Sequence, residues 1–423
     1  MKILLVTDAP PPPALVAGGG QRTDLVIRAL SEFAEVHLLL ICWKSQAEAY
    51  QKVGPFEALW PGRFAGCVEL KEPLLPKPLR ALSKVLTRKQ KHVAHEIYRE
   101  PLRYLPHPEV AGPAREILLK GGYDLVFGRF LRSPAVGGFL DAQSPVPIIQ
   151  DVDDVDSQIM RVKLPRSSLV YNRLTWKWRW PRVERAIAQA IQPAKEVFFV
   201  NPVDQIRFPG ANSSILPNIP HHFAVEGVGE ALEDAGNDYA PTLLFVGRIA
   251  TTGNNQGVDH FVKHVWPLVR LRVENARLRI VGSGMADRDR AKWSHVPGVD
   301  LVGFVEDLKP EYARAHVSIC PVYWGGGSKI KIVESMSYGR VVVAAPHAFE
   351  AYSGLATHRK EIWHAEDDAK FAEGCIRLLT DAPFRQQMAA AARELVLREF
   401  TYDKFKKTVQ RAALEAVRPS GKL

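Results

Sequence analysis

Cysteine is scarce in this sequence, and its spacing excludes two common classes of site. The four cysteines among the 423 residues lie far apart, and no two of them form a CxxC pair. Zinc-ribbon and thioredoxin-like chemistry therefore have no support. Cys42 and Cys320 lie in apolar runs typical of strands, so we interpret them as buried free thiols, as a reducing cytosol allows.

Long apolar runs are also missing. None approaches the roughly 18 residues that a transmembrane helix needs, so no membrane span is predicted. The start, MKILLVTDAPPPP, holds one lysine and a short apolar run that prolines follow at once, unlike a signal peptide. We interpret Lys2–Thr7 as the first buried strand of a cytoplasmic protein.

The dinucleotide-binding fingerprint is incomplete. In AGGGQRTD, which begins at Ala17, the pattern G-x-G-x-x-G requires a third glycine where Thr23 stands. The end of the second strand is apolar and lacks the acidic residue that would bind a ribose, so a nicotinamide-dependent dehydrogenase is disfavoured. Gly19 and Gly20 instead suggest a lip that lets a substrate approach the backbone, with Arg22 meeting a phosphate or a backbone carbonyl.

Negative charge is in deficit, mainly in the first half. The net charge is +8 over residues 1–222 and +2 over residues 223–423. This surplus favours an anionic partner such as a membrane surface, a lipid phosphate or an acidic glycan. Two basic stretches, Leu74–Arg103 and the Trp-containing Arg173–Arg185, fit either a membrane interface or helices with solvated basic faces. No nucleic-acid motif is present.

Short apolar strands alternate with helical patterns along the whole chain. This alternation predicts an α/β protein with parallel sheets covered on both faces. The expected helices are Arg22–Glu32, Gly257–Arg272, Leu308–Arg314 and Ile330–Tyr338. The expected strands are Lys2–Thr7, Val36–Cys42, Leu125–Phe127, Ile148–Gln150, Val197–Val200, Thr242–Val246, Leu278–Val281, Leu301–Val302, Val317–Cys320 and Val341–Ala344.

The strands fall into two series, which predicts two Rossmann-like domains, residues 1–222 and 241–400. The acidic, Gly-containing segment 223–240 separates them as a linker, and residues 401–423 form a C-terminal helix that packs back on the first domain. We expect ligands in the cleft between the two domains.

The stretch WGGGSKIKIVESMSYGRVVVAAP, residues 324–346, is the most informative. Backbone N–H groups at a glycine-rich helix entry, here Gly326, Gly327 and Ser328, form a concave anion site. Lys329 and Lys331 add positive charge. Glu334 follows about one turn later, where its carboxylate can accept hydrogen bonds from a sugar diol. Together they suggest a nucleotide-sugar site.

A second candidate group follows the first strand of the second domain. Gly247 ends that strand, and Arg248 emerges at its carboxyl end, where open α/β sheets bind ligands. Arginine offers a rigid fork for phosphate. The alternative is a salt-bridged surface residue. Asn254 and Asn255 are interpreted as turn residues with an N-cap role, or as ligands.

Two further glycine turns remain open between ligand contact and plain structure. Gly303, Phe304 and Val305 follow a short strand, and their backbone either pairs with a nucleobase edge or forms a turn. Gly282 and Gly284 flank a serine after another strand and either admit a ligand or make a tight turn.

Acidic residues cluster after a buried strand of the first domain. QDVDDVDS, residues 150–157, contains four aspartates, including Asp151 and Asp153. At a strand end they can bind Mg²⁺, position acceptor hydroxyls or cap a helix. Arg129 and Arg132 follow a neighbouring strand and can face the same cleft.

The whole chain resembles the GT-B fold glycosyltransferases of the family-4 type, also called glycosyl transferases group 1. FVGR, VGFVEDL and GGGSKIKIVESMSYGRVVVA carry the resemblance, since the last is similar to the family signature G-x-G-[ST]-[RK]-x-K-x-x-E-A-M-A-x-G-x-P-V-V-A. The first half resembles the family more weakly, through MKILLVTD, the glycine lip and LPN at Leu216–Asn218.

The resemblance implies roles for these residues. Arg248 and Lys331 would hold the donor diphosphate, and Lys329 would make a second contact. Glu334 would bind the ribose hydroxyls. The backbone around Gly326–Ser328 would contact the sugar and phosphates, and Gly303–Val305 would flank the base. No metal would be needed, because cationic groups stabilise the leaving diphosphate.

Three positions depart from the family pattern. Gly326 stands where many relatives have a glutamate, and the lysine that relatives carry after the GR pair is absent, with Gln256 standing before Gly257. Arginines occupy Gly128–Ser133, where several relatives have a histidine. These departures concern the donor more than the class of reaction.

The sequence therefore predicts a retaining glycosyltransferase that uses a UDP- or GDP-sugar as co-substrate, with no other cofactor. The glycan, lipid-linked or small-molecule acceptor would bind the basic first domain near the lip and strand-end residues Gly19, Gly20, Arg22, Arg129, Asp151 and Asp153. The protein would be cytoplasmic, with peripheral contact to an anionic membrane. A GT-B nucleotide-sugar epimerase and a non-catalytic sugar-nucleotide-binding subunit of a glycan-synthesis complex are the alternatives.

Overall fold

A computed structural model describes residues 1–15, 18–70, 103–153, 155, 170–236, 238–325 and 329–418, with the backbone alone for 170–173. The chain divides into two compact units. Unit 1 comprises Met1–Leu216 and Phe405–Leu423, and unit 2 comprises Pro217–Lys404.

Unit 1 is built on a seven-stranded sheet in the order β3-β2-β1-β4-β5-β6-β7, in which every pair of neighbours is parallel. The central strands are mainly apolar and are buried along their length because helices cover both faces of the sheet. The strands are β1 (Lys2–Thr7), β2 (Glu35–Cys42), β3 (Phe64–Glu69), β4 (Leu125–Arg129), β5 (Ile148–Asp153), β6 (Glu196–Phe199) and β7 (Ser213–Ile215).

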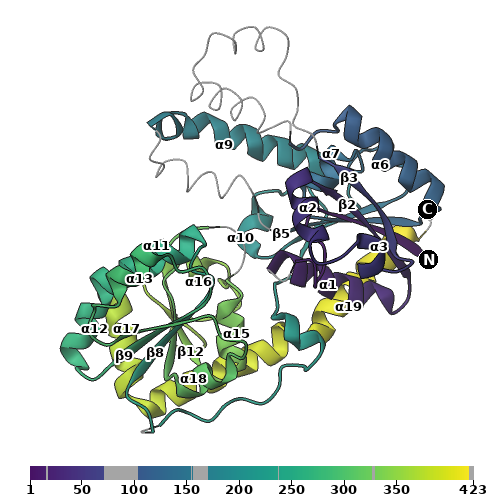
Figure 1. Cartoon of the computed structure of the whole chain (residues 1–423). Coiled ribbons are helices and arrows are strands. Elements are labelled where there is room, and N and C mark those ends of the chain that lie inside the picture. Colours follow the sequence, from purple (N-terminus) through teal and green to yellow (C-terminus); the bar gives the residue numbers. More distant parts are fainter. Residues whose placement is uncertain are drawn as a thin grey trace. The chain divides into compact units, whose positions relative to one another are not determined.

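The helices of unit 1 lie on both faces of this sheet (Figure 1). They are α1 (Gly18–Ser31), α2 (Lys44–Gln51), α3 (Phe56–Leu59), α6 (Pro108–Gly121), α7 (Arg132–Val136), α9 (Val170–Ile191) and α10 (Pro202–Ile206). The last helix of the chain, α19 (Tyr402–Val417), belongs to unit 1 from Phe405 onward.

Unit 2 repeats the plan with six parallel strands in the order β10-β9-β8-β11-β12-β13. Its largest apolar cluster includes Phe245, Trp266 and Trp293. The strands are β8 (Thr242–Val246), β9 (Arg277–Val281), β10 (Val299–Gly303), β11 (Val317–Cys320), β12 (Val341–Ala344) and β13 (Trp363–His364).

The helices of unit 2 also cover both faces of its sheet (Figure 1). They are η2 (His221–Ala224), α11 (Thr252–His260), η3 (Phe261–Val265), α12 (Trp266–Arg272), α13 (Asp287–Trp293), α14 (Lys309–Arg314), α15 (Lys331–Ser337), α16 (Pro346–Glu350), α17 (Asp368–Thr380) and α18 (Ala382–Glu399).

Arginines hold part of the segment predicted as a linker against unit 2. Arg385 pairs with Asp234 at 2.9 and 2.6 Å, and Arg340 donates to the carbonyls of Leu232 and Glu233 at 3.2 and 2.5 Å. Arg385 lowers the pKa of Asp234 to about 2, although burial acts in the opposite direction. The domain boundaries drawn from the sequence stay predictions.

The predicted α/β class with two parallel sheets is confirmed, and each predicted strand has its counterpart. Two helix starts are wrong by four or more residues, because α1 begins at Gly18 and not at Arg22, and α11 begins at Thr252 and not at Gly257. Among the described residues, no helix combines the length and the apolar character that crossing a bilayer requires.

Candidate functional site

The sheet of unit 2 has a point at which the chain changes direction. From β8 the chain proceeds through β9 to β10 on one side, and it then crosses to β11, which pairs with the other side of β8. The loops after β8 and β11 therefore diverge at the carboxyl edge of the sheet, which is where open α/β sheets bind ligands. Arg248 follows β8, and the segment containing Lys329 follows β11.

Lys331 lies at this point and is held by two elements. Its Nζ donates to Asn254 Oδ1 at 2.7 Å and lies 4.3 Å from the centroid of the Phe245 ring. The Asn254 amide donates in turn to the Arg248 carbonyl at 2.9 Å. Burial lowers the pKa of Lys331 to about 8. The Lys331 ammonium group thus has a fixed position and is more acidic than an exposed lysine.

Gly247 makes room for this lysine. A Cβ atom at that position would lie 2.6 Å from Lys331 Nζ. Position 282 requires glycine for a different reason. Its φ is +145°, and an added Cβ atom would lie 2.0 Å from the Gly247 carbonyl oxygen. The close approach at Gly282 is therefore between two loops of the protein itself.

Arg248 is exposed beside this lysine. In the part of the chain that the structure describes, its guanidinium makes no ion pair, so the sequence alternative of a surface salt bridge is not observed. The N-cap interpretation of Asn254 and Asn255 is wrong, because both lie inside the first turns of α11, whose N-cap residue is Thr251. Asn254 instead links the backbone carbonyl of Arg248 to Lys331 Nζ.

Glu334 lies on α15, three residues beyond Lys331. Its Oε2 accepts a hydrogen bond from the Tyr312 hydroxyl at 3.2 Å. Burial raises the pKa of Glu334 to about 6, and the Tyr312 hydrogen bond and the Lys331 charge act in the opposite direction. The carboxylate is therefore partly protected from water and still ionised at neutral pH.

The loop after β10 lies at the same edge of the sheet. Gly303 ends the strand at a φ of +85°, a conformation that favours glycine. Phe304 is 71% exposed, whereas Val305 packs against the apolar cluster that includes Leu244 and Tyr312. An exposed aromatic ring can stack on a flat ligand.

The entry to α15 is only partly described. Gly326, Gly327 and Ser328, which the sequence predicts to contact a donor, lie outside the described residues. Lys329 is partly buried, and its carbonyl accepts from the Tyr352 hydroxyl at 3.0 Å. The predicted helix Ile330–Tyr338 is one residue shorter at each end, Lys331–Ser337.

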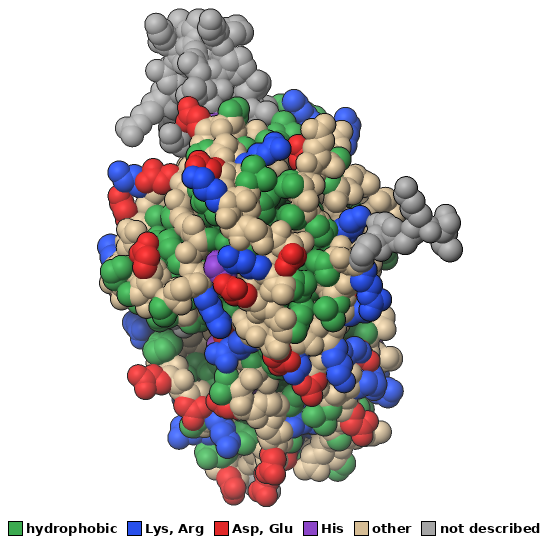
Figure 2. Space-filling view, turned by 90° about the vertical axis from the view of Figure 1, so that its right-hand side faces the viewer, with side chains coloured by type: hydrophobic (Ala, Val, Ile, Leu, Met, Phe, Trp, Pro, Cys, Tyr) green, Lys and Arg blue, Asp and Glu red, His purple; other side chains and the backbone are tan. Residues whose placement is uncertain are grey.

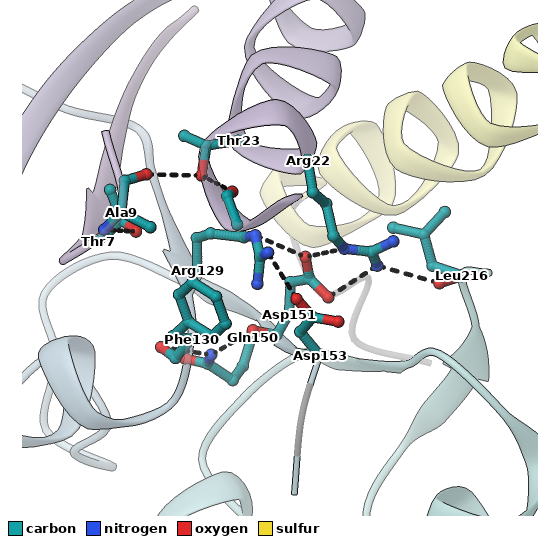
Figure 3. Close-up of polar contacts among 11 residues, drawn as sticks. Thr7, Ala9, Arg22, Thr23, Arg129, Phe130, Gln150, Asp151, Asp153 and Leu216 are labelled. Carbon is teal, nitrogen blue, oxygen red and sulfur yellow. Dashed lines mark hydrogen bonds and ion pairs between the residues drawn. The ribbon is translucent and has the colours of Figure 1, made fainter. Parts of the chain in front are cut away.

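Four predicted acceptor residues come together in unit 1 as a buried ion cluster (Figure 3). The Arg22 guanidinium binds both oxygens of Asp151 at 2.9 Å, and Arg129 pairs with Asp153 at 2.7 Å and Asp151 at 3.4 Å. Each of the four is at most 8% exposed. Their charges compensate one another inside the unit, so contact with an acceptor stays a prediction.

The magnesium alternative for the aspartate run gains no support where it can be examined. Among the described residues, no group of three or more His, Cys, Asp or Glu side chains is arranged to hold a metal ion. Asp154 and Asp156 lie outside that part of the chain.

A cavity of about 360 Å³ lies in unit 1 at the corresponding change of direction, between β1 and β4. Its lining includes Asp8, Gly19, Tyr50, Phe130 and Arg132. Gly19 was predicted for this role, whereas Asp8 and Tyr50 were missed. The position of Asp8 directly after a buried strand was a usable signal.

The backbone beside this cavity is strained. Phe130 and Asp153, at the ends of adjacent strands β4 and β5, have φ values of 57° and 55°. Such conformations are costly for residues other than glycine and concentrate at functional sites. Gly20 is needed for packing, because a Cβ there would lie 2.0 Å from the Leu15 carbonyl oxygen.

Comparison with known families identifies part of the chain. Residues 240–381 match the family model described as glycosyl transferases group 1. The match covers the site residues of unit 2 from Gly247 to Glu334. No curated protein matches the sequence.

Solved structures similar to this chain are glycosyltransferases of the GT-B fold. Sucrose-phosphate synthase from Thermosynechococcus elongatus has a TM-score of 0.67 at 15% identity and covers 98% of each chain. HepE from Anabaena, in complex with UDP and glucose, has a TM-score of 0.59 at 13% identity over 98% of this chain and 99% of that one. WaaG, a glycosyltransferase involved in lipopolysaccharide biosynthesis, has a TM-score of 0.54 at 15% identity over 97% and 99%. The predicted GT-B fold is thereby confirmed.

Proposed function

We propose that this chain, a glycosyltransferase of the GT-B fold whose residues 240–381 form a glycosyl transferases group 1 domain, transfers a sugar from a nucleoside diphosphate to an acceptor hydroxyl with retention of configuration. The observation that carries this proposal is the position of Arg248, Lys331 and Glu334 at the change of direction in the sheet of unit 2, where Asn254 joins the Arg248 backbone carbonyl to Lys331 Nζ and Glu334 lies on the same helix as Lys331. Two cations and one carboxylate at that edge match a diphosphate joined to a ribose.

In this proposal Arg248 and Lys331 hold the diphosphate and stabilise the negative charge that grows as the sugar leaves. Fixed charges of this kind need no reorganisation during the reaction. Lys329 and the backbone of Gly326–Ser328 would make further donor contacts. Glu334 accepts hydrogen bonds from the ribose hydroxyls, and Gly303, Phe304 and Val305 flank the base. Since the two side chains supply the positive charge, we propose that no metal is required.

We favour a UDP-sugar over a GDP-sugar as the donor. The support is that HepE, which covers nearly the whole of this chain, was solved with UDP, with UDP and glucose, and with UDP-glucose. The departure at Gly326 leaves the donor sugar to experiment.

We place the acceptor in the cavity of unit 1 lined by Asp8, Gly19, Tyr50 and Arg132. Arg132 and Asp8 approach to 3.4 Å there, and the Tyr50 hydroxyl donates to the Asp8 carbonyl at 3.0 Å. A cavity with one ion pair and an otherwise largely apolar lining suits an acceptor that offers both hydroxyls and an apolar part.

We also propose that unit 1 contacts an anionic membrane through one face of α9. Leu174 and Trp178 are 73% and 42% exposed on this helix, and Lys177, Arg182 and Arg185 are exposed at matching helical spacing. On the face drawn in Figure 2, acidic and basic side chains are interspersed. The basic and aromatic face of α9 suits the surface of an anionic bilayer.

The test of the function is transfer by the purified chain from a panel of UDP- and GDP-sugars, with the anomeric configuration of the product read by NMR. Arg248→Ala and Lys331→Met should each lower kcat by roughly 10²–10³, as expected when a preorganised charge is lost. An exposed control is Arg272→Ala on α12. Equal turnover of Arg248→Ala and the parent chain would overturn the assignment.

The alternatives give other outcomes in the same assay. A nucleotide-sugar epimerase would change the donor in the absence of any acceptor. A non-catalytic subunit would bind the donor tightly with neither hydrolysis nor transfer.

A further inference from the structure

We propose that Tyr312 is a positioning residue for Glu334. Its hydroxyl holds one carboxylate oxygen of Glu334 so that the other oxygen faces the ribose diol. The inference rests on the proposed function, in which Glu334 binds that diol. Tyr312 lies on α14 and Glu334 on α15, so the contact joins two elements.

The hydrogen bond leaves half of the carboxylate available. The Tyr312 hydroxyl donates to Oε2 at 3.2 Å. Among the described residues, no other side chain donates to either carboxylate oxygen. A carboxylate can accept about four hydrogen bonds, so Oε1 keeps its full accepting capacity. The single Tyr312 hydrogen bond thus orients the Glu334 carboxylate and leaves most of its hydrogen-bond accepting capacity unused.

Tyr312 is itself fixed and therefore able to set a direction. The side chain is fully buried, and its ring stacks on that of Tyr338 with a centroid distance of 4.5 Å and an interplanar angle of 19°. Its carbonyl accepts from Arg340 Nε at 2.7 Å. Groups that touch the substrate are most precise when packing locks the side chains behind them.

The protonation states agree with this direction of donation. Burial and the Glu334 charge raise the pKa of Tyr312 well above its usual value of 10, so the phenol stays protonated. The hydroxyl of Ser335 approaches the Tyr312 hydroxyl at 3.4 Å and donates to it. The polar chain therefore runs from Ser335 through Tyr312 to Glu334, which favours the ionised carboxylate.

The groups that act on Glu334 come from two elements. They are Lys331 on α15 itself and Tyr312 on α14, and both lower the pKa of Glu334 against the effect of burial. Tyr338, just past the end of α15, feels the Glu334 charge, and Asp307 and Glu226 raise the pKa of Tyr338 in the same sense. Removing the Tyr312 hydroxyl should therefore raise the pKa of Glu334, because less would then oppose the effect of burial.

The test is Tyr312→Phe in the full chain, with initial rates measured against donor concentration from about pH 5.5 to 8. Loss of a hydrogen bond to a charged group should raise KM for the donor roughly tenfold near pH 6.5, with a smaller change in kcat. The acidic limb of kcat/KM should move to higher pH, and raising the pH should recover much of the affinity.

Tyr338→Phe is the matched control, because it removes a hydroxyl from the same ring stack without touching the Glu334 hydrogen bond. It should leave the acidic limb in place. A Tyr312→Phe variant that only melts earlier, with an unmoved limb and an unchanged KM, would overturn the inference. If Glu334→Gln also left KM unchanged, the diol role in the proposed function would fail instead.

Discussion

Lys331 and Glu334 carry opposite charges, and burial disfavours the charged form of each side chain. Burial lowers the pKa of Lys331 to about 8 and raises that of Glu334 to about 6. Below pH 6 the carboxylate gains its proton, and above pH 8 the ammonium loses its own. We therefore predict a bell-shaped dependence of kcat/KM for the donor on pH, with limbs near 6 and 8. Initial rates at low donor concentration measure it.

Two variants assign the limbs. Lys331→Arg keeps its charge at high pH, so any remaining activity should lose the alkaline limb. Glu334→Gln cannot titrate, so its weaker activity should lose the acidic limb. A profile that keeps both limbs in both variants would place the two titrations on other groups.

Single residues of this site differ in how far the sequence could predict them. Arg248 follows the end of a strand, and Lys331 and Glu334 lie in the helix that follows a glycine run, which are local signals. Tyr312 gave no such signal, because its role comes from a contact with a residue 22 positions away. The pairing of Arg22 with Asp151 spans 129 positions and turns two predicted ligands into partners of each other.

The proposed membrane contact lies on a single element, α9. Glu184, the acidic residue near its basic face, is partly buried and pairs with Arg207 at 2.7 Å, which leaves Lys177, Arg182 and Arg185 as the exposed charges among the side chains of α9 that the structure describes. We predict that the chain co-sediments with vesicles of phosphatidylcholine mixed with phosphatidylglycerol and not with phosphatidylcholine alone. Added salt should weaken the binding.

Replacement of Trp178 by Ser on that face should lower the bound fraction several-fold, since its ring would sit at the lipid interface. The matched control is Leu271→Ser on α12, which removes a side chain that is 81% exposed in unit 2. If both variants bind as the parent chain does, α9 does not carry the membrane contact. If the chain binds short acidic peptides as well as anionic vesicles, the partner of this face is a protein.

At the scale of elements, strands were easier to predict than helix ends. Apolar runs such as Val341–Ala344 mark buried parallel strands directly. The start of α11 was missed because Gly253 and the two asparagines have low intrinsic helix propensity. Tertiary packing decides instead, since a Cβ at Gly257 would lie 1.9 Å from the Pro321 carbonyl oxygen, and glycine lets the helix lie against that loop.

The whole molecule consists of two units that the chain enters in the order unit 1, unit 2, unit 1. The return segment completes unit 1 through α19, where Phe405 and Val409 are buried and the Gln410 amide donates to the Ala29 carbonyl at 2.8 Å. Sequence alternation predicted two series of strands. It could not show in detail where α19 packs, because contacts such as those of Arg411 with Glu196 and Gln410 with Ala29 join residues 215 and 381 positions apart.

Because the proposed nucleotide site lies within unit 2 and α19 packs within unit 1, we predict that thermal unfolding shows two transitions with separate sensitivities. UDP should raise the midpoint of one transition by mass action. Phe405→Ala should lower the other, since emptying a buried aromatic site costs about 3–5 kcal/mol, whereas Leu414→Ala, 45% exposed on the same helix, should change neither. Differential scanning calorimetry of the parent chain with and without UDP, and of the Phe405→Ala and Leu414→Ala variants, measures these midpoints. If UDP raised the same transition that Phe405→Ala lowers, nucleotide binding and the packing of α19 would belong to one cooperative unit.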